Sequence, residues 1–470
     1  MIRKPTFTEA LIPLLAMILL LGIGYGKYGL PIQALLLIAA AVASIIAKRV
    51  GYEWKDMING ISDKIHSSLP SLFVMVCVGA MIASWMVSGT IPMMIYYGIK
   101  IIDPQFLFVT AFLVTAVIST FTGTSFGSAG TAGVAIMGIA IALGVPLEIA
   151  AGAVISGAVF GDKLSPFSDT TILAPIAAGS ELYEHIRHML YTTGAATITC
   201  LIAYTFIGFS IPVEAMANPE TVNAVLKNLE QLYSFHWILL LPPILVFYGA
   251  YTKKPTIPML LLSSLIGIVF GMIFQDFTLK TAMMAFVNGF KVDMLASSAH
   301  TESVKAITTL LNRGGLMGMM STVLLVFCAF AFAGIFSKAG CIEVILTRIV
   351  NSITSVGNLI TATVASTLFM SIVTGSSYLA LLIPGEMFKD LYKKFGLAAK
   401  NLSRTLEDAG TCAVPIVPWS VAGTYMASTL GVSTFDYMPW AILCYGSMIF
   451  AIIFGYTGFG IAKIKEQKDN

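Results

Sequence analysis

The stretch GDKLSPFSDTT, residues 161–171, sets Asp162, Lys163 and Asp169 beside a proline in an otherwise apolar region. A charge at the centre of a bilayer costs about 2.5–3.5 kcal/mol on insertion scales, so ionisable residues there usually serve a function. Hard cations prefer oxygen ligands, and the segment offers them from Asp162, Ser165, Ser168, Asp169, Thr170 and Thr171. The alternative is structural, with hydroxyl groups satisfying a bent backbone and Lys163 pairing with an aspartate. We favour an ion site.

The composition identifies the surroundings of this stretch as a membrane. Of the 470 residues, 57% are hydrophobic and only 11% are charged, whereas about a quarter of the residues in a soluble domain are charged. The net charge of +3 is too small to indicate a nucleic-acid partner. The six cysteines show no C-x-x-C spacing, so we expect neither a disulfide framework, nor a structural metal, nor another cofactor. We therefore expect an all-α polytopic protein embedded in lipid.

About ten segments are long enough to cross a bilayer, which takes roughly 20 residues. Most are continuous, at 10–26, 30–47, 70–88, 190–211, 236–251, 256–274, 315–336 and 438–461, and two are broken by Pro, Gly and polar residues, at 148–175 and 404–430. Residues 105–145 and 358–388 each consist of two apolar pieces around a polar tip. Such pieces favour re-entrant hairpins, whose tips are tolerated in a membrane only where protein or a cavity surrounds them.

A shift of 252 residues, the difference between 374 and 122, aligns the chain with itself. It sets STFTGTSF (119–126) on SIVTGSSY (371–378), Pro166 on Pro418 and Ser168 on Ser420. The matches cluster at the polar interruptions, and the two halves have opposite orientation in the predicted layout. This pattern is typical of the inverted repeats of secondary transporters. We predict a first repeat at 1–211, a linker at 212–235 and a second repeat at 236–470.

The hairpin tips and the second broken segment add further candidate ligands. A broken helix leaves unpaired N–H and C=O groups at its two stumps, which can bind ions together with nearby hydroxyl groups. The candidates are Thr122, Gly123, Thr124 and Ser125 in the first tip, Thr374, Gly375, Ser376 and Ser377 in the second tip, and Ser420 in the second break. Glu407 and Asp408 are adjacent on a predicted helix, so at most one is expected to face the site. The alternative is that Glu407 and Asp408 are not ligands and are both solvated charges near the cytoplasmic interface.

The distribution of basic residues sets the orientation. With the N-terminus in the cytoplasm, most of the 27 Lys and Arg residues fall on the cytoplasmic side of the predicted layout. We therefore expect a multi-pass protein of the cell membrane with both termini in the cytoplasm. A homodimer is compatible with this architecture.

The motifs resemble those of the NhaC-type Na⁺/H⁺ antiporters, a branch of the ion transporter superfamily. The similarity covers nearly the whole chain, and its most specific part is GDKLSPFSDTT, supported by HIRHMLYTTGAA (185–196), LLNRGG (310–315) and LSRTLEDAGT (402–411). It implies secondary active transport through repeats that each pair a hairpin with a broken helix. Ile172 and Ser420 stand where we expect Asn in this family, which makes the site less polar. Exchangers of organic acids, such as malate for lactate, and amino-acid carriers are similar proteins.

The resemblance implies Na⁺/H⁺ exchange first, and a Na⁺- or H⁺-coupled carrier of a small organic acid or amino acid second. Broken helices in inverted repeats suit alternating access better than a channel, and no spacing of a nucleophile and base indicates an enzyme. A carboxylate binds Na⁺ when ionised and is neutral when protonated, so one group can serve both ions. Desolvation in the membrane should favour this exchange at Asp169. We expect Asp169 to be the main shared ligand, Asp162 the second candidate and Lys163 the charge-balancing partner.

Overall fold

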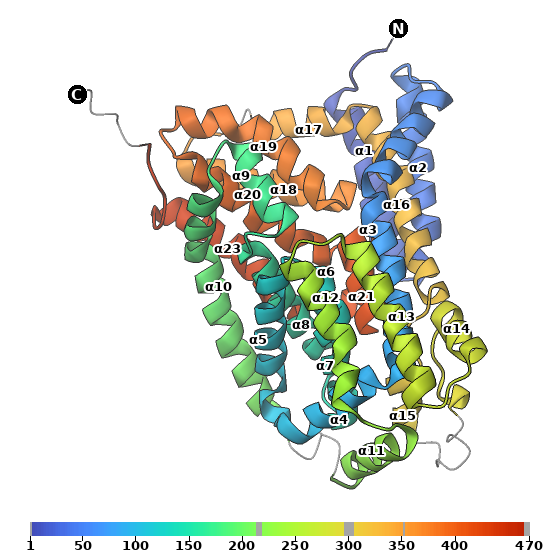
Figure 1. Cartoon of the computed structure of the whole chain (residues 1–470). Coiled ribbons are helices and arrows are strands. Elements are labelled where there is room, and N and C mark those ends of the chain that lie inside the picture. The colour runs from blue at the N-terminus through green and yellow to red at the C-terminus, as the bar shows by residue number, and fades with distance from the viewer. Residues whose placement is uncertain (1, 213–218, 296–304, 351–352, 465–470) are drawn as a thin grey trace.

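The computed structural model describes residues 2–212, 219–295, 305–350 and 353–464 (Figure 1). Within these ranges every regular element is a helix, and Leu397 and Lys463 form an isolated β-bridge. Nine helices are long and apolar enough to cross a membrane, or up to eleven if each of two bent pairs counts as one span. The predicted all-α polytopic class is confirmed, and these counts bracket the predicted number of about ten crossings.

The first part of the chain forms ten α-helices. They are α1 (Phe7–Leu19, continued by a π-helix at Leu20–Tyr25), α2 (Ile32–Arg49), α3 (Trp54–Ser88), α4 (Thr90–Ile101), α5 (Leu107–Thr122), α6 (Ser125–Ser128), α7 (Val134–Leu143), α8 (Leu147–Leu164), α9 (Asp169–Ala178) and α10 (Leu182–Ser210). The first hairpin consists of α5 as one arm and α6 to α7 as the other.

The middle and last parts continue the all-helical fold. The middle holds α11 (Pro219–Leu232), α12 (Leu241–Tyr251), α13 (Thr256–Phe274), α14 (Leu279–Asn288) and α15 (Lys305–Leu311). The last part holds α16 (Met320–Lys338), α17 (Cys341–Val350), α18 (Val356–Thr374), α19 (Ser377–Lys394), α20 (Ala399–Ala413), α21 (Val421–Leu430), α22 (Thr434–Tyr437) and α23 (Ile442–Thr457). The second hairpin consists of α18 and α19.

The shift of 252 residues relates helices as well as sequence motifs. It carries α5 onto α18, α8 onto α20 and α9 onto α21, with the two hairpin arms that follow Gly123 and Gly375 also in register. Both glycines end their arms in the left-handed region, at φ +67° and +60°. In Figure 1 the first hairpin approaches the middle of the molecule from the lower end, and the second approaches it from the upper end. The register of these helices supports the predicted inverted repeats, whose division at 1–211 and 236–470 stays a prediction.

Two predicted segments differ from the structure. The crossing expected at 70–88 begins at Trp54, because Glu53 and Asp56 form a capping box and the polar residues that follow do not interrupt the helix. The predicted linker contains α11, an amphipathic helix that buries Val225, Leu229 and Leu232 and packs against α4 and α7. Residues 213–218 of that linker, and residues 465–470 of the predicted second repeat, lie outside the described residues.

Candidate ion-binding site

Each hairpin tip packs on the break of the broken helix in its own repeat. A Cβ atom built on Gly123 would lie 2.8 Å from the backbone carbonyl carbon of Phe167, in the break between α8 and α9. A Cβ built on Gly375 would lie 3.2 Å from the Cα of Ser420, just before α21. The Val421 N–H also donates to the Gly375 carbonyl at 3.3 Å. Glycine is needed at both tips because each combines a positive φ with close backbone approach.

A cavity of about 690 Å³ lies where these tips and breaks meet. Besides both tips and the first break, its wall includes α3 and the connection from α12 to α13. Of the predicted ligands, those that line it are Thr122, Gly123, Thr124, Ser125, Asp162, Ser168, Asp169, Thr170, Gly375, Ser376 and Ser377. Those outside its lining are Lys163, Ser165, Thr171, Thr374, Glu407, Asp408 and Ser420.

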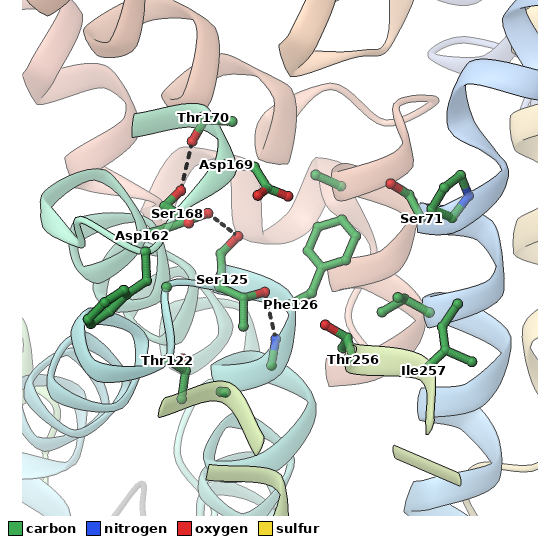
Figure 2. Close-up of a pocket in the computed structure, with 18 of the residues that line it drawn as sticks. Ser71, Thr122, Ser125, Phe126, Asp162, Ser168, Asp169, Thr170, Thr256 and Ile257 are labelled. Atoms are coloured by element: carbon green, nitrogen blue, oxygen red, sulfur yellow. Dashed lines mark hydrogen bonds between the residues drawn. The ribbon is translucent and has the colours of Figure 1, made fainter. Parts of the chain in front are cut away.

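Asp162 lies in the last turn of α8, beside the first hairpin tip. Its carboxylate is half-buried, and its Oδ2 accepts a hydrogen bond of 2.8 Å from the Ser125 hydroxyl. Figure 2 shows this bond beside the contact between the hydroxyl groups of Ser168 and Thr170, which are 3.1 Å apart. Several oxygen atoms from a hairpin and a broken helix therefore converge on one wall of the cavity.

Asp169 begins α9 and is exposed to the cavity rather than desolvated. Its Oδ2 accepts a hydrogen bond of 3.1 Å from the hydroxyl of Tyr378, which belongs to the second hairpin. The expectation that the membrane desolvates Asp169 is therefore wrong, because the cavity keeps this carboxylate accessible. Asp162 is the less accessible of the two aspartates.

Several predicted ligands satisfy the backbone of the breaks. The Ser420 hydroxyl donates to the Val414 carbonyl at 2.6 Å and accepts from the Gly423 N–H at 2.8 Å, so it caps α21. The Thr171 hydroxyl lies within 2.9 and 3.0 Å of the carbonyl oxygens of Asp162 and Lys163. The remaining hydroxyls outside the cavity lining, Ser165 and Thr374, accept from backbone N–H groups two residues further along the chain. For these residues the geometry matches the structural alternative.

Lys163 pairs with Asp408 of the second repeat, not with an aspartate of its own segment. Its Nζ lies 2.7 Å from Asp408 Oδ1, and both side chains have 0% exposure. The Thr192 hydroxyl also donates to Asp408 Oδ1 at 3.0 Å. The Glu407 side chain is equally buried, so the alternative of solvated interfacial charges for Glu407 and Asp408 is wrong. The two carboxylates that line the cavity are thus left without Lys163 as a partner.

Two lysines that were not predicted also line the cavity, Lys253 and Lys254 between α12 and α13. Lys253 Nζ lies 4.9 Å from the centre of the Phe167 ring, in a cation–π contact beside the first break. The pair KKP between two apolar runs indicated only a cytoplasmic loop, because basic residues of that kind usually follow topology. In the described part of the chain no group of three His, Cys, Asp or Glu residues could hold a metal ion.

Comparisons with known proteins show which family the sequence is similar to. The model of the Na⁺/H⁺ antiporter family matches residues 98–180 and 157–459. An uncharacterised Na⁺/H⁺ antiporter of Haemophilus influenzae is 47% identical over 99% of this chain and 98% of its own length. The Na⁺/H⁺ antiporter NhaC of Alkalihalophilus pseudofirmus is 40% identical over 92% of this chain and 91% of its own length. The malate-2H⁺/Na⁺-lactate antiporter of Bacillus subtilis is 34% identical over 97% of this chain and 96% of its own length. These relatives are transporters and not enzymes, as the sequence predicted.

Proposed function

The chain belongs to the Na⁺/H⁺ antiporter family, and from this premise we propose that it exchanges Na⁺ for H⁺ through the cavity. The observation that carries the proposal is the pair of carboxylates, Asp162 and Asp169, on the cavity wall. Secondary transporters bind their ions where broken segments of inverted repeats meet, which is the position of this cavity. Asp162, held by Ser125, is the main Na⁺ ligand, and Asp169 is the second.

Local charge supports cation binding at this wall. Because the ammonium group of Lys163 lies against Asp408, it does not neutralise the aspartates of its own segment. Carboxylate and hydroxyl oxygens suit a hard cation, and Asp162 and Ser125 provide both within 2.8 Å of one another. A carboxylate site of this kind binds Na⁺ when ionised, and a proton bound at the carboxylates of this region opposes Na⁺, which is the requirement for exchange.

The test uses proteoliposomes with an acidic interior and a fluorescent pH indicator inside. Addition of Na⁺ outside should collapse the pH gradient without any organic solute, while the same concentration of choline chloride should not. A gradient that survives Na⁺ alone would reject Na⁺/H⁺ exchange.

A second candidate is the exchange of a small organic acid or amino acid coupled to Na⁺ or H⁺. The cavity volume of about 690 Å³ falls within the range of roughly 300–1,000 Å³ of small-molecule sites. Lys253 and Lys254 line it and could bind a substrate carboxylate. The relative named as a malate-2H⁺/Na⁺-lactate antiporter is compatible with this candidate. If collapse of the gradient requires malate, lactate or an amino acid in addition to Na⁺, the second candidate replaces the first.

We also infer a cell-membrane location with both termini in the cytoplasm. Figure 1 supports termini on one side, since the described residues before α1 and after α23 both lie in the upper half of the molecule. The excess of basic residues on that side of the predicted layout supports the cytoplasmic assignment. A homodimer stays a proposal, to be tested by the mass of the purified protein.

A further inference from the structure

Glu407 is a buried carboxylate that the proposed Na⁺ site does not use. It lies on α20 with 0% exposure, and its Oε1 accepts a hydrogen bond of 2.7 Å from the Thr411 hydroxyl. Its Oε2 is buried and has no hydrogen-bond partner among the described residues. A carboxylate in this setting is costly when ionised unless a cation or donors compensate it. A bound proton removes that cost.

The neighbouring cations have other partners. Lys163 Nζ contacts Asp408 Oδ1 at 2.7 Å and the Ser447 hydroxyl at 3.3 Å. Arg404 Nη1 donates to the Gly460 carbonyl at 2.8 Å. Neither cation forms an ion pair with Glu407 within 4.0 Å, whereas Asp408 has one. Of the two adjacent acids, Asp408 therefore has a cation as its partner, whereas Glu407 has none and is suited to alternate between charged and neutral forms.

Glu407 is also connected to the cavity. Thr411, its hydrogen-bond donor, is one of the residues that line the cavity. The Thr411 hydroxyl thus joins the cavity lining to Oε1 of the carboxylate in a single contact. Asp162 lines the same cavity as Thr411, so a Na⁺ ion bound at Asp162 adds positive charge on the side of the cavity that Glu407 contacts and favours the ionised form of Glu407. Na⁺ and H⁺ can then oppose each other while occupying different groups.

We propose that Glu407 is the proton-binding group of the exchange cycle, separate from the Na⁺ ligands Asp162 and Asp169. The inference rests on the proposed Na⁺/H⁺ exchange. When the Na⁺ site is empty, the Thr411 hydroxyl passes its hydrogen to Glu407 Oε1 and takes a proton from the cavity side, and the reverse transfer returns the proton to the cavity when Na⁺ binds. Linkage requires that each ion weaken the other by the same factor, and such couplings are typically about 5–150-fold.

The charged and titratable groups around Glu407 come from several elements. Helices α18 and α23, which pack against α20, contain no Asp, Glu, Lys, Arg or His. On α20 and the other helices packed against it, the charges that act on Glu407 are those of Lys163 and Asp162 on α8. The other charged or titratable side chains of these helices include Asp169 on α9, His185 and His188 on α10, Glu386 and Tyr392 on α19, and Arg404, Asp408 and Cys412 on α20 itself. His185 and His188 hydrogen bond to Ser403 and Asn401, respectively, and not to Glu407.

The test measures proton release and Na⁺ binding by the purified full-length protein in weakly buffered detergent solution. Addition of NaCl to the unaltered protein should release protons, as reported by a pH-indicator dye, whereas choline chloride should not. Glu407→Gln should bind ²²Na⁺ but release no proton, and its Na⁺ affinity should lose its dependence on pH. Glu386→Gln, which alters an exposed acid on the adjacent α19, is the matched control and should behave like the unaltered protein.

The outcomes separate this inference from the proposed function. If the unaltered protein exchanges Na⁺ for H⁺ but Glu407→Gln releases protons in normal amount, Glu407 is not the proton site. If the unaltered protein shows neither exchange nor Na⁺-dependent release, the proposed function fails and this inference with it. If Glu407→Gln does not fold, proton release by Glu407→Asp tests whether Glu407 is the proton site. Its Na⁺-dependent release should persist with a shifted pH profile, and an unchanged profile would overturn the proposal.

Discussion

Lys163 and Asp408 form a fully buried ion pair that joins the two inverted repeats, with 2.7 Å between Nζ and Oδ1. Lys163 lies in the last turn of α8 and Asp408 lies on α20, so the contact connects the broken helices of both halves. Because Lys163 is peptide-bonded to Asp162, the pair also holds the residue before it in place beside the cavity.

Asp408→Asn should destabilise the protein strongly. Removal of one partner of a buried ion pair leaves an uncompensated charge and costs about 3–5 kcal/mol, whereas an apolar replacement of both partners is often close to neutral. Lys163→Met with Asp408→Leu should therefore melt at a higher temperature than either single variant, as measured by thermal unfolding in detergent. If the double variant loses as much melting temperature as the two single variants together, the ion pair contributes little to stability.

Leucine at either hairpin tip should abolish transport while the protein still inserts into the membrane. Gly123→Leu and Gly375→Leu each place a side chain at a positive φ, and the Cβ alone meets the neighbouring break at 2.8 or 3.2 Å. Gly194→Leu on α10 is the control, because a Cβ there meets nothing within 4 Å. Sodium uptake into proteoliposomes is the measurement. Normal uptake in both tip variants would mean that the tips need no close approach to the breaks.

The opposite orientation of the repeats predicts opposite accessibility of the two hairpin bases. All six native cysteines are buried, so the background of labelling should be low. In intact cells, an impermeant thiol reagent should modify Glu148→Cys at the base of the first hairpin, but not Lys394→Cys at the base of the second. Permeabilised cells, in which both should react, provide the control. Equal labelling of both in intact cells is incompatible with the proposed topology.

Lys253→Gln distinguishes the two candidate substrates. If the cavity carries only Na⁺ and H⁺, loss of this ammonium group should leave exchange within a few-fold of normal. If an organic carboxylate is transported, organic-acid flux should fall at least about tenfold, since charged hydrogen bonds contribute roughly 1.5–3 kcal/mol. Lys27→Gln, at an exposed position between α1 and α2, is the matched control. Proteoliposome flux with and without the acid is the measurement.

The repeats, hairpins and breaks could be predicted from the sequence because glycines and polar residues interrupt apolar runs at equivalent places. The partner of Lys163 could not, since Asp408 is 245 residues away and only the packing of α8 near α20 brings them together. Lys253 was missed for a related reason. Apolar runs indicate that α12 and α13 exist, but they do not indicate that their connection borders the cavity. The exposure of Asp169 likewise depends on the cavity, which no local pattern reveals.

Whether Asp162 binds Na⁺ can be measured in proteoliposomes by comparing four proteins. A pH gradient is imposed, Na⁺ is added, and the rate of collapse is measured for the unaltered protein, Asp162→Asn, Asp169→Asn and the exposed control Asp390→Asn. Asparagine keeps one carbonyl oxygen but carries no negative charge. We predict no Na⁺-dependent collapse with Asp162→Asn, weakened Na⁺ affinity with Asp169→Asn and a normal rate with Asp390→Asn. Exchange by Asp162→Asn at the normal rate and with normal Na⁺ affinity would show that Asp162 is not a Na⁺ ligand.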